Sequence, residues 1–338
     1  MSDANLFVQQ RSNRRRSALL VVVFLLFFAW IGFGGDYAYS LMTADADPGA
    51  YRHTFPWFGI AATALAIGMA WYGWRNGPKQ VLWAAGAWEL VNPAKPEEQT
   101  LVNVVEEMAI ASGVPRPSVW IVPDPDPNAF ATGIDERHAH IAVTEGMLTT
   151  VNRDELQGVV AHEIAHIRNH DVKLMTLLAA LVGVMALISD GMIRTGRHGR
   201  FRGRSSGSGG KKGGLGALVL AIWLVSIILA PLVSRLLALA VSRKREFLAD
   251  ASAAQFTRNP GALAAALRKI EDVAQPTKAI KRGTAHLCIA DPLGRRSSVK
   301  DGFFADLVGT HPPMATRIAR LKAMAYQLER TGTIGEAG

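Results

Sequence analysis

The sequence has 338 residues, of which 49% are hydrophobic and only 19% are charged, and its formal net charge is +9. Ordinary soluble domains carry about 25% charged residues, so this composition excludes a disordered chain and argues against a wholly soluble one. The single cysteine, Cys288, excludes an intramolecular disulfide framework and any metal site that needs several cysteines. The positive charge fits nucleic acid, a membrane surface, or basic residues gathered in a few segments.

Two apolar runs near the N-terminus predict a transmembrane hairpin. A basic cytoplasmic arm, residues 1–16, precedes the run from Ser17 to Gly34, which contains no charge and is long enough to span a bilayer as a helix. Arginines before this run and aspartates after it place the N-terminus in the cytoplasm by the positive-inside rule. A second run, Phe55 to Trp74, has aromatic residues at both ends, as membrane interfaces do. This second run favours an uncleaved hairpin, residues 17–76, instead of a cleaved signal peptide.

Residues 77–170 are predicted to form the first part of a soluble domain. The expected elements are a helix through Leu101 and Met108 that ends at Gly113, strands at Ser118–Val122 and His138–Val143, and a helix from about Glu155 through His170. Asp154 is the predicted N-cap of the last helix. A small sheet surrounded by helices is therefore expected in this part of the chain.

Residues 171–241 contain a third and a fourth apolar run, 174–188 and 215–241, which predict two more membrane helices. The Gly-rich linker between them, 194–214, carries seven Lys and Arg residues and no acidic residue. If both runs cross the membrane fully, this linker lies outside and violates the positive-inside rule. Three alternatives stay open: the pair forms a hairpin that does not cross, it crosses against the rule, or the membrane is not a bacterial inner membrane.

Residues 242–338 are predicted to form the second soluble part. Asn259-Pro260 has the pattern of a helix N-cap followed by proline at the first helical position, and residues 314–330 form a last helical stretch. The basic arm contributes a charge of +3 and the linker +7, so the rest of the chain carries −1. The soluble parts have no basic excess, and Phe201 is the only aromatic residue of the linker, so no nucleic-acid partner is expected.

The motif His162-Glu163-x-x-His166 predicts a zinc site. On a helix, two histidines four residues apart project from one face and can bind one Zn²⁺ through neutral imidazole nitrogens. Glu163 between them is placed to take a proton from a water molecule at the metal. The alternative is a helix with two surface histidines. Apolar neighbours such as Val159 and Ile167 argue against it, because two buried histidines that bind neither a metal nor another polar partner would be costly.

A catalytic zinc site needs a third protein ligand and an open position. The metzincin pattern would place Gly and His where this chain has Asn169 and Val172, so that subclass is excluded. His170 continues the spacing of four, but a further helical turn carries it away from the metal. The remaining option is a carboxylate on a later helix, with Glu246 as ligand and Asp250 hydrogen-bonded to one of the two histidines. An ordinary charged helix face is the alternative here.

Four segments of the chain, taken in order, point to a known family. They are Asn128-Ala129-Phe130-Ala131-Thr132-Gly133, His162-Glu163-x-x-His166, Glu246-x-x-x-Asp250, and His311-Pro312-Pro313 with Arg317 four residues later. These segments resemble the family of membrane zinc endopeptidases that includes the bacterial heat-shock protease HtpX and the CAAX prenyl endopeptidase. The resemblance implies that His162, His166 and Glu246 bind one Zn²⁺, that Glu163 is the catalytic base, and that Asp250 supports a ligand.

The resemblance also implies roles for the remaining two motifs. Asn128 to Gly133 would lie on an edge strand beside the cleft, where an extended peptide substrate could pair with the main chain. From the residues alone, a loop bounded by prolines is equally compatible. His311 or Arg317 would donate a hydrogen bond to the oxyanion that forms during hydrolysis. The alternatives are a turn histidine before two prolines and an arginine in a structural salt bridge.

The implied fold is predominantly α with a small β-sheet, and it combines about four membrane helices with a zincin catalytic domain of gluzincin-like type. The implied function is a membrane-embedded zinc metalloendopeptidase of membrane protein quality control, which hydrolyses misfolded membrane proteins with a zinc-activated water. It would be a multi-pass protein of the inner (plasma) membrane, with its catalytic domain facing the cytoplasm. The alternatives are a catalytically inactive zinc-binding scaffold and a prenyl-protein processing protease, which has more membrane spans.

Overall fold

The computed structural model describes residues 3–44, 51–177, 179, 243–273, 279, 287–290 and 312–335. The linker 194–214, the run 215–241, most of the run 174–188 and His311 lie outside the described residues, so what is expected of them stays a prediction. The chain divides into two compact units. Unit 1 comprises Met1–Ser17, Trp74–Ala180 and Ala238–Gly338, and unit 2 comprises Ala18–Gly73 and Leu181–Leu237.

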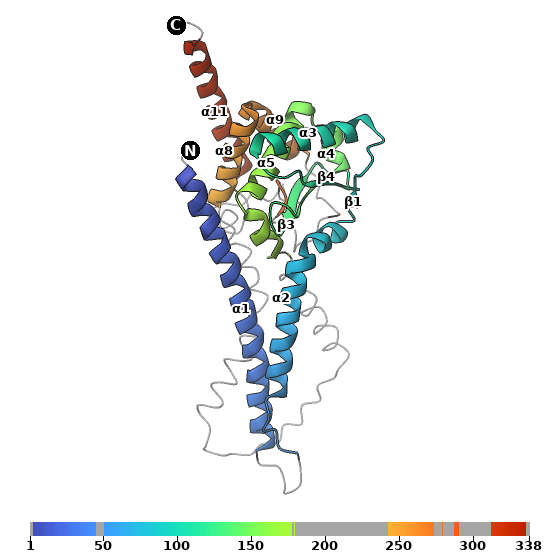
Figure 1. Cartoon of the computed structure of the whole chain (residues 1–338), viewed down its shortest axis with the longest axis vertical. Helices are drawn as coiled ribbons and strands as arrows, with labels where there is room; N and C mark the ends of the chain where they lie inside the picture. Colours follow the sequence, from blue (N-terminus) through green and yellow to red (C-terminus); the bar gives the residue numbers. More distant parts are fainter. Residues whose placement is uncertain are drawn as a thin grey trace. The chain divides into compact units, whose positions relative to one another are not determined.

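Two long helices, α1 (Asp3–Thr43) and α2 (Trp57–Ala84), cover the two N-terminal apolar runs. Within unit 2 they run side by side (Figure 1). Gly32 makes this approach possible, because a Cβ at that position would lie 2.7 Å from the Cβ of Ala62. α1 begins at Asp3 and therefore includes most of the basic arm, residues 1–16.

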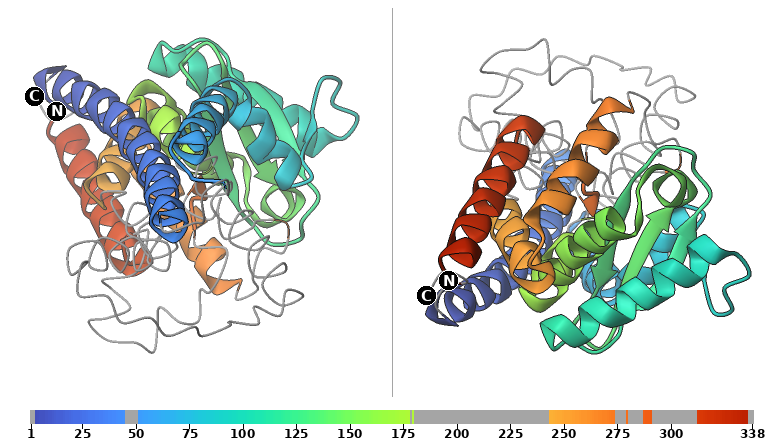
Figure 2. Two further views of the ribbon diagram at one scale, coloured as in Figure 1. Left: turned by 90° about the horizontal axis from the view of Figure 1, so that it is seen from below. Right: turned by 90° about the horizontal axis from the view of Figure 1, so that it is seen from above.

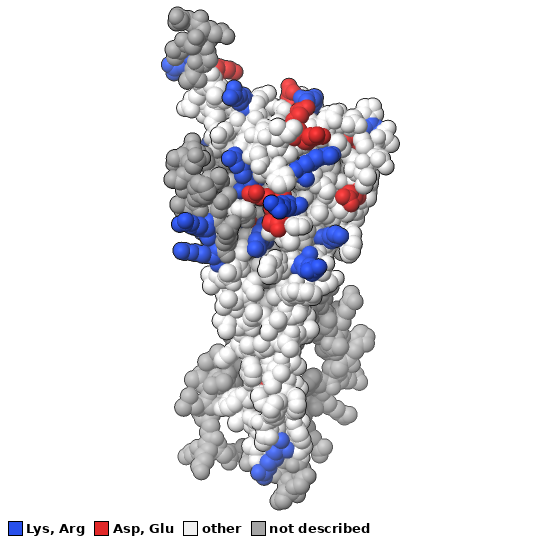
Figure 3. Space-filling model, in the orientation of Figure 1, with Lys and Arg blue, Asp and Glu red and all other residues white. Residues whose placement is uncertain are grey.

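The membrane interpretation rests on α1. Among the described residues, one helix is long and apolar enough to cross a membrane, and it is Arg11–Leu41 within α1. On the face shown in Figure 3, the part of unit 2 that is described carries few charged side chains. Large apolar side chains of both helices are exposed, among them Leu19, Leu26, Trp57, Ile60 and Leu65. The four membrane helices expected from the sequence stay a prediction.

Unit 1 contains a four-stranded mixed sheet in the order β1-β2-β4-β3. Its strands are β1 (Trp88–Glu89), β2 (Ser118–Val122), β3 (Ala129–Gly133) and β4 (Ala139–Thr144). β2 and β4 are parallel, whereas β1 and β3 are antiparallel to their neighbours. Helices otherwise dominate the described residues, so the prediction of a mainly α fold with a small sheet is confirmed.

The segment that the sequence left open between loop and strand is a strand. Ala129–Gly133 pair along their whole length with Ala139–Val143 of β4, which makes β3 an edge strand of the sheet. The prolines end at Pro127, and Asn128 then begins the pairing by donating its backbone N–H to Thr144 Oγ1 at 2.8 Å. β2 lies at the predicted residues, and β4 is shifted by one residue at each end.

The remaining helices described in unit 1 pack against the sheet or against one another. They are α3 (Pro96–Ser112), α4 (Glu145–Thr150), α5 (Arg153–Arg168), α8 (Arg243–Thr257), α9 (Pro260–Asp272) and α11 (Met314–Gly335). α3 ends at Gly113 as predicted, because its φ of 73° is left-handed and glycine adopts that conformation without strain. α9 begins after Asn259 as predicted, and the Oδ1 atom of Asn259 accepts the N–H of Ala262 at 3.1 Å.

The predicted N-cap of α5 is wrong by two residues. The cap is Asn152 and not Asp154: the Oδ1 atom of Asn152 accepts the N–H of Glu155 at 2.9 Å, and Glu155 accepts the N–H of Asn152 at 2.8 Å. This reciprocal pair is a capping box, which satisfies two backbone donors at once. Asp154 instead lies inside the first turn, where its negative charge interacts favourably with the helix dipole.

α5 is the central helix of unit 1. It contacts β3 and β4 of the sheet as well as α3, α8 and α9 (Figure 2). Val159, Val160 and Ile164 on this helix are fully buried. The contact with α9 is closest at Gly158, where a Cβ would lie 2.9 Å from the Cα of Leu263. Packing on several sides therefore fixes the helix that carries the two motif histidines.

Candidate metal centre

α5 carries His162, Glu163 and His166 to one buried cavity. The Nε2 atoms of the two histidines are 3.2 Å apart, and their rings are nearly perpendicular, at 89°. The side chains of His162 and Glu163 are only 1% exposed. Helical spacing thus directs both imidazoles to the same point, as the motif predicts.

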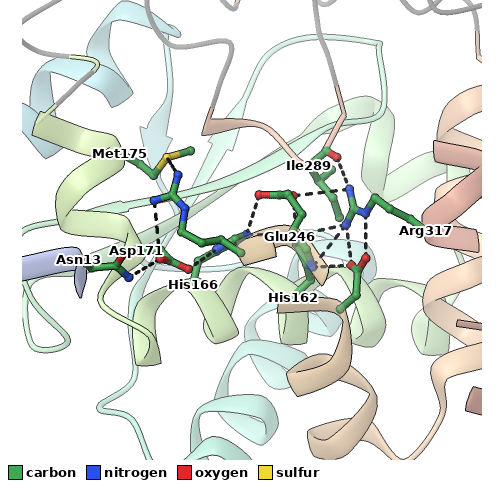
Figure 4. Close-up of polar contacts among 10 residues, drawn as sticks. Asn13, His162, His166, Asp171, Met175, Glu246, Ile289 and Arg317 are labelled. Carbon is green, nitrogen blue, oxygen red and sulfur yellow. Dashed lines mark hydrogen bonds and ion pairs between the residues drawn. The ribbon is translucent and has the colours of Figure 1, made fainter. Parts of the chain in front are cut away.

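Glu246 reaches the same point from α8. Its carboxylate oxygens lie 3.7 Å from the Nε2 atom of His162 and 3.6 Å from the Nε2 atom of His166. The candidate ligand atoms of these three residues all lie within 4.8 Å of one another (Figure 4). The fold therefore brings together the three residues that the sequence predicts as metal ligands.

The donor set fits a zinc ion. Two imidazole nitrogens and one carboxylate are ligands that Zn²⁺ accepts in sites with three protein ligands. The Oε2 atom of Glu163 is buried and has no hydrogen-bond partner among the described residues. A buried carboxylate oxygen in this state is costly unless a water molecule or a cation completes its contacts. His162, His166 and Glu246 are thus arranged to hold zinc, with Glu163 beside it.

Asp250 lies one turn after Glu246 on α8 and fixes the orientation of His162. Its Oδ1 atom is 3.0 Å from the Nδ1 atom of His162, which leaves Nε2 directed at the cluster. Burial and the Arg317 guanidinium oppose a charge on His162, but hydrogen bonds with Asp250 and Glu246 outweigh them and raise its pKa to about 9. Burial would raise the pKa of Asp250, yet Arg317 and His162 lower it to about 2.

Arg317 on α11 is bound to Asp250. Its Nε and Nη2 atoms donate to the two carboxylate oxygens at 3.0 and 2.7 Å, and its Nη1 atom donates to the Ile289 carbonyl at 2.9 Å (Figure 4). The side chain is fully buried and is not among those that line the cavity. Burial alone would lower the pKa of Arg317, but Asp250 and Glu246 raise it above its usual value. This geometry matches the salt-bridge alternative for Arg317.

Glu163 lines the same cavity as the metal cluster and contacts β3. Burial raises the pKa of its carboxyl group, and the positive charges of His162 and His166 offset only part of this effect. The backbone N–H of Ala131 on β3 donates a hydrogen bond to it. A raised pKa lies closer to neutral pH, and a carboxyl group with such a pKa serves well as both proton acceptor and proton donor.

The cavity brings the cluster together with β3. Its lining residues are Ala131, His162, Glu163, His166, Val172, Met175, Glu246, Leu287, Cys288 and Ile289. Of the six predicted substrate-binding residues, Ala131 is therefore the one that faces the cavity. The next two strand residues contact Thr176, because its Oγ1 atom lies 2.9 Å from Thr132 Oγ1 and accepts the N–H of Gly133 at 3.1 Å.

The beginning of the β3 edge is paired within the chain. Phe130 forms an antiparallel bridge with Cys288, and the carbonyl of Ala129 accepts the N–H of Ile289 at 2.9 Å. Asn128 is fully buried, and its Nδ2 atom donates to the carbonyl of Ala290 at 3.1 Å. Part of the strand edge expected to pair with a peptide is therefore already paired within the chain, and Ala131 is the strand residue that faces the cavity.

Asp171 contacts the metal cluster although no sequence motif predicts it. Its Oδ2 atom lies 3.2 Å from the Nδ1 atom of His166. The signal in the sequence is its position shortly after the second histidine, where a helix end lets a side chain reach back. His170 before it has a φ of 56°, a left-handed conformation, and α5 ends at Arg168, two residues before the predicted end.

Comparison with protein families and with curated proteins gives concordant matches. A family model described as "Peptidase family M48" matches residues 95–325. The "Protease HtpX homolog" of Thermoanaerobacter pseudethanolicus is 42% identical over 275 residues, which cover 80% of this chain and 87% of that protein. The "Protease HtpX homolog" of Levilactobacillus brevis is 39% identical over 295 residues, which cover 81% of this chain and 96% of that protein.

A solved structure also aligns with the chain. The "Crystal Structure of S. mikatae Ste24p" matches with a TM-score of 0.44 and 17% sequence identity, covering 94% of this chain and 67% of that one.

Proposed function

This chain belongs to peptidase family M48, and we propose that it is a membrane-embedded, zinc-dependent endopeptidase of the HtpX type. Membership of this family makes it a protease, whose substrates are polypeptides. The observation that supports the finer proposal best is the approach of His162, His166 and Glu246, whose ligand atoms lie within 4.8 Å of one another. Glu163, the acid of the motif, lies in the same cavity.

His162, His166 and Glu246 would hold the metal. Zinc, when bound, lowers the pKa of a water molecule and polarises a peptide carbonyl. In the proposed reaction, the Glu163 carboxylate takes a proton from the attacking water and later delivers it to the leaving amine. Its raised pKa and the N–H of Ala131 suit it to hold this proton between the two steps. His162 stays oriented through Asp250 throughout.

The substrate would enter as an extended peptide beside β3, and Asn128 to Gly133 form the proposed binding strand. Because the start of this edge is paired with Cys288 and Ile289, the peptide would contact the main chain around Ala131, which faces the cavity. Main-chain pairing with an edge strand accepts many sequences, which suits a protease of misfolded proteins. His311 is the remaining proposed donor to the oxyanion. We assign Arg317 to support of Asp250, because each of its three nitrogens donates to Asp250 or to the Ile289 carbonyl and the side chain does not line the cavity.

The proposed location is the cell inner (plasma) membrane. The apolar helix Arg11–Leu41 and the arginines in its first turns support an anchor with a cytoplasmic start. In this proposal the chain begins with the basic arm 1–16 and the transmembrane hairpin 17–76. The catalytic domain comprises residues 77–170 and 242–338, and the third and fourth membrane helices lie within 171–241. Substrates would be misfolded membrane proteins, cleaved at the cytoplasmic face.

The test compares cleavage of a model membrane substrate by the zinc-loaded full-length protein and its Glu163→Gln variant. Glu145→Gln, an exposed glutamate on α4, is the matched control. We expect Glu163→Gln to keep its zinc and to lose about 10²–10⁴-fold in kcat, while Glu145→Gln cleaves normally. Normal cleavage by Glu163→Gln would overturn the assignment of the base. Cleavage that persists after zinc is removed by a chelator would overturn the zinc mechanism.

A further inference from the structure

Asp171 orients the second motif histidine through the nitrogen that faces away from the cluster. The Nδ1 atom of His166 is 3.2 Å from Asp171 Oδ2, while its Nε2 atom is 3.6 Å from Glu246 Oε1. A carboxylate that accepts the Nδ1 proton fixes the tautomer in which Nε2 carries the lone pair for a metal. Asp171 is fully buried, so its charge needs partners inside the protein.

One partner of Asp171 comes from the N-terminal helix. Asn13 on α1 donates through Nδ2 to Asp171 Oδ1 at 2.5 Å and to the Asn169 carbonyl at 3.1 Å (Figure 4). Asn13 is only 1% exposed, although both neighbouring turns of α1 carry exposed arginines. It lies in unit 1 together with Asp171. The part of α1 that precedes the apolar run thus contributes a side chain two contacts away from a metal ligand.

The second partner is Arg245, the residue directly before the ligand Glu246 on α8. Its Nη1 atom lies 3.7 Å from Asp171 Oδ1, and its Nη2 atom donates to the Met175 sulfur at 3.5 Å. Arg245 is 1% exposed, and a buried arginine of this kind needs a counter-charge. Asp171 supplies that counter-charge, so each of the two charges makes the burial of the other possible.

A related arrangement occurs at both histidines, although Arg317 is hydrogen-bonded to its aspartate and Arg245 is an ion-pair partner at 3.7 Å. His162 has its Nδ1 atom against Asp250, which is paired with the buried Arg317, and His166 has its Nδ1 atom against Asp171, which is paired with the buried Arg245. Arg245 and Arg317 are the two largest fully buried side chains among the described residues. Two long cations in such positions are costly unless each holds a specific anion.

We propose that Asp171 is the positioning residue of His166, held by Asn13 and Arg245, and that the N-terminal helix is thereby part of the support of the zinc centre. This inference rests on the proposed function in one respect, namely that His166 binds zinc. The competing view is a purely structural contact between α1 and the end of α5. In that case, removing Asp171 lowers stability and leaves the metal affinity of the folded protein unchanged.

The experiment measures zinc affinity of the full-length protein in detergent micelles by competition with a chromophoric chelator. All variants carry Glu163→Gln, which prevents self-cleavage and separates metal binding from turnover. Asp171→Ala is expected to weaken zinc binding about 10–100-fold, and Asp171→Asn, which keeps the size and an acceptor oxygen, about tenfold. The controls are Asp154→Ala and Asn103→Ala, two exposed residues on α5 and α3, which should leave the affinity unchanged.

The role of Asn13 is tested by coupling. Asn13→Ala should weaken zinc binding several-fold, and it should have no further effect in the Asp171→Ala background, because it acts through Asp171. The absorption spectrum of the Co²⁺-loaded protein should change in the Asp171 variants, since the orientation of His166 sets part of the ligand field.

The outcomes separate the inference from the proposed function. Zinc binding by Asp171→Ala and Asp171→Asn within twofold of their parent, with an unchanged Co²⁺ spectrum, would overturn the positioning role alone. Equal effects of Asn13→Ala with and without Asp171 would overturn the link through α1. If the parent protein binds no zinc, the proposed function itself fails. Should Asp171→Ala not fold, Asp171→Asn decides the question.

Discussion

Replacing Arg317 with methionine separates a supporting role for this residue from a catalytic one. Methionine keeps an unbranched apolar side chain, shorter than that of arginine, and offers no N–H donor and no charge. The variant loses the bonds of 3.0 and 2.7 Å to Asp250 and the bond of 2.9 Å to the Ile289 carbonyl. Asp250 is 2% exposed, so its carboxylate would then be buried without the cation that lowers its pKa.

The expected cost follows from this burial. Breaking one partner of a buried ion pair typically destabilises a protein by about 3–5 kcal/mol. At about 2–4 °C per kcal/mol, the metal-free protein should melt about 6–20 °C lower. The double variant Arg317→Met with Asp250→Leu removes both charges and should recover most of this loss, since apolar replacements of buried pairs are often nearly neutral. Its zinc affinity should stay about 10–100-fold weaker, because His162 has lost its Nδ1 partner.

Thermal unfolding of the metal-free full-length protein in detergent measures the first effect, and chelator competition measures the second. Lys322→Met, an exposed substitution on the same helix, is the control and should melt like the wild type. A wild-type melting temperature for Arg317→Met, together with a loss of kcat at unchanged zinc affinity, would refute the supporting role. That result would instead favour the oxyanion donor implied by the family resemblance.

Two further predictions follow from the packing of α5 and from the pKa of His162. Gly158→Ala should lower the stability by about 1–2 kcal/mol in thermal unfolding, because the new methyl group lies 2.9 Å from Leu263 Cα and overpacking outweighs the gain in helix propensity. Gly261→Ala, whose nearest neighbour is Asn259 Oδ1 at 3.6 Å, should not lower it, and equal melting of the two variants would contradict the close contact of α5 and α9. The pKa of His162 is raised from 6.5 to about 9, so in the metal-free protein its contribution to stability is present below pH 6.5 and is lost as the pH rises through about 9. Zinc must displace this proton, so its apparent affinity should rise with pH up to about 9, and pH-independent binding in chelator competition would count against a protonated His162.

Local spacing predicted the parts of the metal centre that lie on single helices. His162 and His166 are one turn apart on α5, and Glu246 and Asp250 are one turn apart on α8, so each pair was fixed by helical geometry. Gly113 and Asn259 likewise marked helix ends through their own conformational preferences. Features that depend only on residues close together in the sequence, such as helix ends and pairs one turn apart, could therefore be inferred without the fold.

Contacts between distant segments could not be inferred in this way. Asn13 reaches Asp171 across 158 positions, and Arg317 reaches Asp250 across 67, so nothing in the local pattern identifies these partners. The strand at Ala129–Gly133 was ambiguous for the same reason, because it exists through pairing with β4. The cap of α5 was misplaced because Asn152 and Asp154 are both competent cap residues, and the choice depends on the return bond from Glu155.

We propose that His162, His166 and Glu246 hold a zinc ion in the cavity of this protease. X-ray absorption at the zinc edge of the zinc-loaded full-length protein tests it most directly. The claim predicts one zinc per chain with nitrogen and oxygen ligands at about 2.0–2.2 Å and no sulfur ligand. Cys288 and Met175 also line the cavity, so a sulfur atom at about 2.3 Å would contradict the assigned ligand set.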